Sequence, residues 1–249
     1  MAVSCLRVCL PFASGTVCGA KTVFFSIHFL ERTLHILMPQ YTHLMNNPQV
    51  AAEHYAFQAY MTPDRWSSVW RQVDLSLDYQ PSQVLEVGAG PGFYKQVMAR
   101  EGISVTTVDI AEDLQPDVVG SVLDLPFADN YFDLCCAFQV LEHLPYESFI
   151  PALQELRRVA RKAVIVSLPD AAAGYPTRIS IPGRGIRDFI LPRPYFKKAH
   201  IFDGQHYWEI NKKKTPLKRI VQDIEQQGFR IRHNQRYAAN MYHRFLVIE

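Results

Sequence analysis

The segment Val84-Leu-Glu-Val-Gly-Ala-Gly-Pro-Gly-Phe-Tyr94 decides how the rest of the chain is interpreted. Its first four residues predict a short buried strand, and glycines follow at alternate positions, Gly88, Gly90 and Gly92. Glycine permits the sharp turn that leads a strand into a helix, and it lets a ligand approach the main chain closely. The N-terminus of the next helix then offers free N–H groups to an anionic group of a ligand. We therefore expect a ligand-binding loop between a strand and a helix.

The spacing of these glycines separates the loop from the common phosphate-binding loops. A dinucleotide-binding loop has the pattern GxGxxG, whereas this loop has GxGxG, and Phe93 stands where the other pattern needs its third glycine. No Gly-Lys-Ser/Thr follows, which excludes a Walker loop. Glu86 stands two residues before the first glycine, where its carboxylate would repel a pyrophosphate. The pattern favours a ligand that carries an amino group and no phosphate.

Two further acidic residues stand at positions that suit a nucleoside. Asp109 ends the predicted strand 105–108, and a carboxylate at such a strand end can accept both hydroxyls of a ribose. Asp124 follows the predicted strand 117–122, where it can accept from the exocyclic amine of an adenine. The alternative for Asp124 is that it only caps the turn that follows it. Both positions point to a nucleoside portion of the ligand.

Apolar segments alternate with helical ones through the middle of the chain. The predicted strands lie at 84–87, 105–108, 117–122, 132–138 and 163–168, and the predicted helices lie at 93–100, 146–160 and 215–227. Strands that are apolar on both faces belong to a parallel sheet covered by helices on both sides. Two last strands, 229–236 and 243–248, predict an antiparallel hairpin at the edge of that sheet.

At this point the sequence resembles the class I S-adenosylmethionine-dependent methyltransferases, and within them the small-molecule and ubiquinone-biosynthesis-like group. The segments that carry the resemblance are Glu86-Val-Gly-Ala-Gly-Pro-Gly92, Val108-Asp-Ile110, Asp124-Leu-Pro-Phe-Ala-Asp-Asn-Tyr-Phe-Asp133 and Gln139-Val-Leu-Glu-His-Leu144. The resemblance covers residues 80–170 well, and the elements of 215–249 match those that close the family's fold. It implies an α/β, Rossmann-like three-layer sandwich with a seven-stranded, mostly parallel sheet and an antiparallel C-terminal edge hairpin.

The resemblance also implies S-adenosylmethionine as the cofactor and a set of residues that would bind it. These are Glu86, Gly88, Gly90, Gly92, Asp109, Ile110, Asp124, Leu125 and Gln139. Glu86 and the glycine loop would hold the methionine portion, and Asp109 would hold the ribose hydroxyls. Ile110 would pack against the adenine, and Asp124 with Leu125 would bind its edge. The glutamine would line the cleft between methyl donor and acceptor.

The sequence gives fewer candidate residues for binding the methyl acceptor than for binding the cofactor. His143 and His206 are candidate general bases for an acceptor that loses a proton, and a plain position at a helix start is the alternative for His143. The candidates for the wall of the acceptor pocket are Tyr207, Trp208 and Glu209. The alternative is that the aromatic pair packs a lid onto the body of the domain. A metal site is not predicted, because the spacing of His200, Asp203, His206 and Glu209 matches no familiar ligand set and methyl transfer needs no metal.

Residues 170–214 interrupt the alternation with prolines and glycines, and we expect a lid-like insertion within a methyltransferase domain of 53–249.

The chain has a net charge of only +2, but the charges are unevenly distributed. Residues 53–169 hold 8 basic and 16 acidic residues, whereas residues 170–219 hold 11 basic and 4 acidic residues. A basic segment suits an anionic acceptor, and a solvated surface is the alternative. We expect a small-molecule acceptor. An RNA or protein acceptor and a non-catalytic S-adenosylmethionine-binding protein stay open.

Composition and cysteine spacing indicate the class of protein and its cellular compartment. A hydrophobic content of 48% over 249 residues excludes a disordered chain, and no apolar run reaches the roughly 18 residues that span a bilayer. The five cysteines show no zinc-ligand or disulfide spacing, which favours a reducing, cytoplasmic compartment. Residues 1–52 form an N-terminal extension. We expect 1–38 to be poorly ordered, with Met38 or Met45 as the working start; a signal-like stretch at 8–20 is the alternative.

Overall fold

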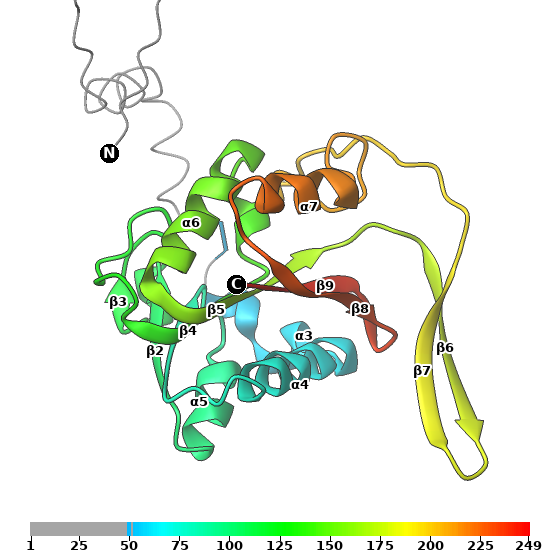
Figure 1. The fold of residues 1–249 in the computed structure, drawn as a ribbon, viewed down its shortest axis with the longest axis horizontal. Coiled ribbons are helices and arrows are strands. Elements are labelled where there is room, and N and C mark those ends of the chain that lie inside the picture. Colours follow the sequence, from blue (N-terminus) through cyan, green and yellow to red (C-terminus); the bar gives the residue numbers. More distant parts are fainter. Residues whose placement is uncertain (1–48, 51) are drawn as a thin grey trace, which may run out of the picture. The chain divides into compact units, whose positions relative to one another are not determined.

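A computed structural model describes residues 49–50 and 52–249 (Figure 1). The predictions for residues 1–38 and for the start of the chain therefore lie outside the described residues. The main sheet has seven strands in the order β3-β2-β1-β4-β5-β9-β8. These strands are β1 (Gln83–Val87), β2 (Ser104–Asp109), β3 (Val118–Val119), β4 (Phe132–Phe138), β5 (Ala160–Pro169), β8 (Ile231–Tyr237) and β9 (Asn240–Ile248).

The direction of the strands confirms the predicted sheet. Strands β1 to β5 pair in parallel, and β9 pairs antiparallel with β5 on one side and with β8 on the other. The central strand β4 is buried along its whole length, as a strand covered on both faces must be. The C-terminal hairpin thus closes one edge of the sheet, with β8 as its outermost strand. This arrangement is the predicted Rossmann-like sandwich.

Helices cover both faces of the sheet (Figure 1). Helices α4 (Pro63–Leu77) and α5 (Phe93–Arg100) lie on one face, and α6 (Phe149–Val159) and α7 (Leu217–Glu225) lie on the other. The shorter helices are η1 (Ala52–Tyr55), α3 (Phe57–Tyr60), η2 (Glu112–Leu114), η3 (Leu141–His143) and η4 (Tyr146–Ser148). None of the described helices is both long and apolar enough to cross a membrane.

The two apolar layers of the core meet at β4. Cys135 points into the layer beneath α6, with Leu153 and Leu156, and Cys136 points into the layer beneath α5, with Met98. Both thiols are fully buried and unpaired. Adjacent residues of a strand face opposite sides, so this pair of cysteines fills both layers as small apolar residues.

The predicted lid-like insertion is partly a regular structure. Strands β6 (Gly174–Ile181) and β7 (Gly185–Pro192) form a separate two-stranded antiparallel sheet. Tyr175 pairs with Leu191 across this sheet, and all of its residues are exposed or half-buried. The prolines and glycines had predicted a lid-like insertion, with no strands assigned to it. Cross-strand pairs of aromatic and branched side chains nevertheless support a hairpin here.

Asp170 connects the end of β5 to the C-terminal hairpin. Its side chain is completely buried, and its Oδ2 accepts a hydrogen bond from the Arg244 Nε at 2.7 Å. The Arg236 Nε lies 3.6 Å from the same oxygen. The other oxygen, Oδ1, accepts from the Asn211 side chain and from the Ala172 N–H. Both oxygens of this buried carboxylate are therefore satisfied, and three separate segments depend on it.

We expect the substitution Asp170→Ala to lower the free energy of unfolding by about 3–5 kcal/mol, because it leaves two arginines without their buried partner. Urea unfolding followed by circular dichroism measures this change. The matched control is Asp188→Ala, which removes an exposed ion pair with Arg178 and should leave the midpoint unchanged. Equal midpoints for D170A and D188A would contradict the role given to Asp170.

Candidate active site

A cavity of about 270 Å³ opens at the carboxyl ends of β1, β2 and β4. Ligands of open α/β sheets bind at this edge, where the loops that follow parallel strands diverge. The loops after these three strands line the cavity, together with residues of η1, α3 and α4. Four residues from the later part of the chain complete the wall, namely Gln205, His206, Tyr242 and His243.

The glycine loop forms one wall of the cavity through its backbone. Gly88 and Gly90 line the cavity with φ angles of +73° and +48°, in the left-handed region that side chains disfavour. A Cβ atom at Gly88 would lie 2.3 Å from the Cγ2 of Val140, so the loop after β1 and the loop after β4 touch without room for a side chain. Gly92 is the N-cap of α5 and lies just outside the cavity wall.

Glu86 is a buried acid at the end of β1, and its Oε2 has no hydrogen-bond partner among the described residues. Burial raises the pKa of this carboxyl to about 8, with Lys95 opposing the shift and Asp109 adding to it. At neutral pH Glu86 is therefore largely protonated when no cation lies beside it. A cationic ligand group beside it would favour the ionised form.

Asp109 ends β2 and lines the same cavity as Glu86. Its Oδ1 accepts a hydrogen bond from the Ala111 N–H at 2.9 Å. Burial raises the pKa of the Asp109 carboxyl, while the N–H groups of Ala111 and Ile110 act against the rise. The structure thus brings Glu86, Asp109 and Ile110 together around one space, although they come from two strands.

Asp124 and Leu125 do not lie on the cavity. Asp124 is exposed, and Leu125 is buried in the apolar core with its N–H donating to the Glu155 carboxylate. Ser121 and Val122 line the cavity instead, because the chain reaches it directly after β3. The predicted strand 117–122 was too long, since β3 ends at Val119, and this error moved the expected contact three residues along the chain.

The end of β4 brings Gln139 and His143 to the cavity. Gln139 has a φ angle of +58°, and its N–H and side chain both donate to Ser167, at 2.9 and 3.2 Å. This turn starts η3, which carries His143 on the cavity wall. The His143 Nδ1 lies 2.6 Å from the Gln49 Oε1 and 3.1 Å from the Gln205 main-chain oxygen. Burial lowers the pKa of His143 to about 4, so its imidazole is neutral at pH 7.

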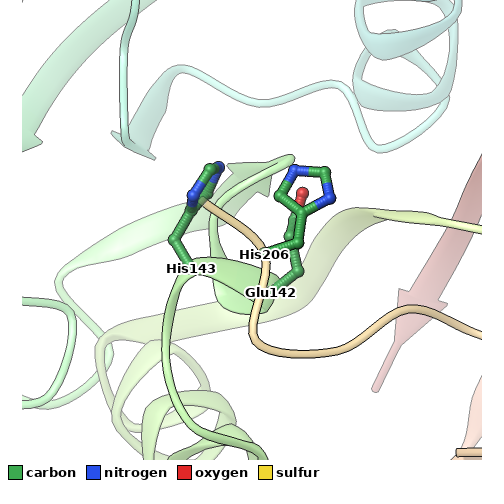
Figure 2. Close-up of side chains that lie close together, drawn as sticks. All are labelled: Glu142, His143 and His206. Atoms are coloured by element: carbon green, nitrogen blue, oxygen red, sulfur yellow. The ribbon is translucent and has the colours of Figure 1, made fainter. Parts of the chain in front are cut away.

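His206 lies beside His143 although 63 residues separate them in the chain. Their rings are 5.0 Å apart and nearly perpendicular (Figure 2). The His206 Nδ1 is 3.5 Å from the Glu209 Oε1. Burial disfavours the charged imidazole of His206, but the carboxylates of Glu209, Glu142 and Asp203 together outweigh burial and raise its pKa above the usual value. The fully buried Glu142 lies against both histidines (Figure 2).

The other residues predicted for the acceptor pocket have different roles in the structure. Tyr207, Trp208 and Glu209 do not line the cavity. Trp208 is 2% exposed, packs edge-on against Phe149, and donates from Nε1 to the Leu144 oxygen at 3.1 Å. Glu209 accepts from the Tyr242 hydroxyl at 2.7 Å. The packing alternative therefore describes Trp208, and Glu209 supports His206 from behind.

Several aromatic residues of the cavity are absent from the predicted set of site residues. Tyr55, Tyr60 and Tyr242 line it, and the Tyr55 ring lies against Gly90. Arg65, on α4, is the one lysine or arginine among the described lining residues, and its guanidinium lies 4.1 Å from the centre of the Tyr60 ring. The sequence signal for two of them is an aromatic stripe, Tyr55, Tyr60 and Trp66, which could fold over a cofactor, but such a stripe more often belongs to a core.

Comparisons with known proteins agree with this architecture. Residues 85–168 match a family described as a methyltransferase domain. An uncharacterized methyltransferase of Mycobacterium avium (strain 104) is 32% identical over 90 residues, which cover 31% of this chain and 35% of that protein. A second one, from Mycobacterium sp. (strain JLS), is 36% identical over 72 residues, covering 25% and 29%. The chain thus spans about a third of the length of the curated relatives it matches.

Solved structures share the fold at low sequence identity. A 1,6-didemethyltoxoflavin-N1-methyltransferase of Burkholderia thailandensis, with bound S-adenosylhomocysteine, has a TM-score of 0.52 and 14% identity over 92% of this chain and 91% of its own. The magnesium protoporphyrin IX methyltransferase of Synechocystis PCC 6803, also with bound S-adenosylhomocysteine, has a TM-score of 0.50 and 16% identity over 89% and 98%.

Residues 85–168 therefore match a methyltransferase domain, and the chain shares its fold with solved methyltransferases. The comparisons do not single out a ubiquinone-biosynthesis-like group, which stays a prediction.

The raised pKa of Glu86 predicts how the stability of the protein depends on pH. Because the folded value, about 8, lies above the unfolded one, this group contributes stability that is full below pH 4.5 and is lost as the pH rises to 8. We expect the free energy of unfolding of the wild type, relative to Glu86→Gln, to fall by up to about 1.4 kcal/mol per pH unit between pH 5 and 8. Urea unfolding at several pH values measures it, with the exposed Glu101→Gln as control. A difference that stays constant with pH would contradict the buried, unpartnered state of Glu86.

Proposed function

We propose that this protein transfers a methyl group from S-adenosylmethionine to a small-molecule acceptor that binds in the same cavity. The observation that carries the proposal is that one cavity collects the buried Glu86, the glycine loop and Asp109, and also His143 and His206. The first group suits an amino acid joined to a nucleoside, and the second suits an acceptor that loses a proton. Donor and acceptor groups would therefore meet in a single cavity.

The cofactor contacts follow from the cavity wall. Glu86 would bind the ammonium group of the methionine portion, and its buried position would strengthen that interaction. Asp109 would accept the ribose hydroxyls, and Ile110 would pack against the adenine. We assign the edge of the adenine to Ser121 and Val122, because these two residues line the cavity where Asp124 and Leu125 do not. The Burkholderia and Synechocystis enzymes, which share the fold, were solved with S-adenosylhomocysteine.

Methyl transfer requires the protein mainly to align the methyl donor with the acceptor and to exclude water. When bound, the cofactor supplies a methyl carbon that its sulfonium has already activated, and the acceptor displaces the sulfur in line. Gln139 is held in a fixed turn by Ser167 and would orient the two reactants. His143 is neutral at pH 7, so its imidazole can accept the acceptor's proton directly or through water.

The residues that line the cavity indicate the chemistry of the acceptor better than the basic charge of the insertion does. Of the basic segment 170–219, only Gln205 and His206 line the cavity, and neither is a lysine or arginine. An anionic group on the acceptor would therefore meet Arg65 rather than that segment. The aromatic side chains of Tyr60 and Tyr242 suit a flat or apolar body for the molecule. We propose a small acceptor on these grounds, and a cytoplasmic location stays a prediction.

Cofactor binding can be tested with two aspartates that sequence analysis had treated alike. We expect Asp109→Ala to weaken binding of S-adenosylhomocysteine at least tenfold, because it removes a charge-assisted pair of hydrogen bonds. Asp124→Ala should leave the affinity unchanged, because this residue is exposed and away from the cavity. Isothermal titration calorimetry measures both. Similar losses in the two variants would contradict the assigned cofactor position.

Methyl transfer itself can be tested without knowing the acceptor. The full chain and D109A are incubated with S-adenosylmethionine carrying a labelled methyl group, together with separate small-molecule, RNA and protein fractions of a cell extract. We expect label in a small-molecule product with the wild type and a loss of at least tenfold with D109A. Label confined to RNA or protein would overturn the proposed acceptor class. Binding of the cofactor without any labelled product would favour the non-catalytic alternative.

A further inference from the structure

We propose that Glu142, His143 and His206 bind a divalent transition-metal ion of the zinc type in the wall of the cavity. Figure 2 shows the three side chains converging, two of them from η3 and one from the insertion. One ligand atom from each residue lies within 4.8 Å of the other two. Bonds of about 2.0–2.2 Å to an ion would bring these atoms to within about 3.5 Å of one another, which small side-chain rotations allow.

Glu142 is the residue that most requires a partner. Its side chain is completely buried, and neither carboxylate oxygen has a hydrogen-bond partner among the described residues. No ion pair of Glu142 is formed with either histidine in that part of the chain, although both rings lie beside it. A buried carboxylate with both oxygens unsatisfied is rare and costly, whereas a bound cation would satisfy it.

Both histidines are oriented as metal ligands usually are. The His143 Nδ1 lies within hydrogen-bond distance of two acceptors, the Gln49 Oε1 and the Gln205 main-chain oxygen. The Gln49 amide orientation is set independently, because its Nε2 donates to the main-chain oxygen of His143 at 3.1 Å. An Nδ1–H that donates to these oxygens leaves the lone pair on Nε2 for a metal.

His206 lies against a second carboxylate, that of Glu209. Its Nδ1 lies 3.5 Å from the Glu209 Oε1, and Glu209 is itself fixed by the Tyr242 hydroxyl and by Lys212. A carboxylate that accepts from Nδ1 fixes the tautomer and makes Nε2 a better ligand, which is the usual arrangement behind a metal-binding histidine. Orientation of the His206 ring would therefore explain why a carboxylate, that of Glu209, is buried at this position.

The donor set indicates the kind of ion. Two imidazoles and one carboxylate suit zinc and related transition metals, whereas magnesium and calcium prefer an all-oxygen set. Three protein ligands leave one coordination position open, as in catalytic rather than structural zinc sites. His143 and His206 both line the cavity, so the open position would face the acceptor.

One consequence rests on the proposed function. An ion at this position would hold the hydroxyl oxygen of the acceptor and ease the loss of its proton to water, with His143 and His206 then acting as ligands rather than as bases. The oxygen would then form a bond to the methyl carbon while the carbon–sulfur bond breaks and its electron pair returns to sulfur. The products would be a methyl ether, the demethylated cofactor and one proton. Metal binding itself needs neither the cofactor nor the acceptor.

The test uses the full chain after treatment with a chelator, with Zn²⁺, Co²⁺ and Mg²⁺ titrated separately in the absence of cofactor. We expect one equivalent of Zn²⁺ or Co²⁺ to bind, with visible absorption bands of cobalt bound by nitrogen and oxygen, and no binding of Mg²⁺. Glu142→Gln and His206→Ala should each weaken Zn²⁺ binding at least tenfold. The control is His233→Ala, which removes a half-buried histidine on β8 that lies outside the cavity wall.

Absence of Zn²⁺ and Co²⁺ binding, or equal affinities for the wild type, E142Q and H206A, would overturn the proposal. Circular dichroism and binding of S-adenosylhomocysteine report whether each variant is folded. If E142Q does not fold, H206A still decides, because His206 lies on the insertion rather than in the apolar core. Metal binding without methyl transfer would leave this site standing and remove only the proposed function.

Discussion

The close contact between the Gly88 backbone and the side chain of Val140 is the constraint on which the site depends. It joins the loop after β1 to the loop after β4 at a distance that no side chain at position 88 would permit. The first loop carries the groups that suit the cofactor, and the second carries Gln139 and His143. Parallel pairing of β1 and β4 places these loops side by side, and the left-handed Gly88, which has no Cβ, lets them approach closely at the cavity.

Buried carboxylates divide into two kinds in this molecule. Asp170 has arginine and amide partners for both oxygens and holds the end of the sheet together. Glu86 and Glu142 are equally buried but have oxygens without partners among the described residues, and both lie at or beside the cavity. The carboxylate that the fold needs is satisfied within the fold. The carboxyl groups of the site keep oxygens available for a ligand, and their burial lowers the folding stability.

Parts of the site could be predicted from sequence because they depend on local order. Glu86 and Asp109 end neighbouring parallel strands, and the edge of such a sheet brings strand ends together whatever the rest of the chain does. Asp124 was misplaced because the length of a short edge strand is set by its neighbours rather than by its own residues. Trp208 and Glu209 share one short segment, yet one belongs to the core and the other supports His206, a difference that sequence alone did not reveal.

The sequence by itself determined the fold class, the order of the elements and the glycine loop with its flanking acid, because hydrophobic periodicity and glycine spacing act over a few residues. Only the tertiary structure decided that His206, far along the chain, would lie beside Glu142 and His143, and that the basic charge of the insertion would stay off the cavity wall. The path of an insertion depends on packing and hydrogen bonds between distant segments, such as the one from Tyr207 to Glu142. No local pattern encodes contacts of that kind.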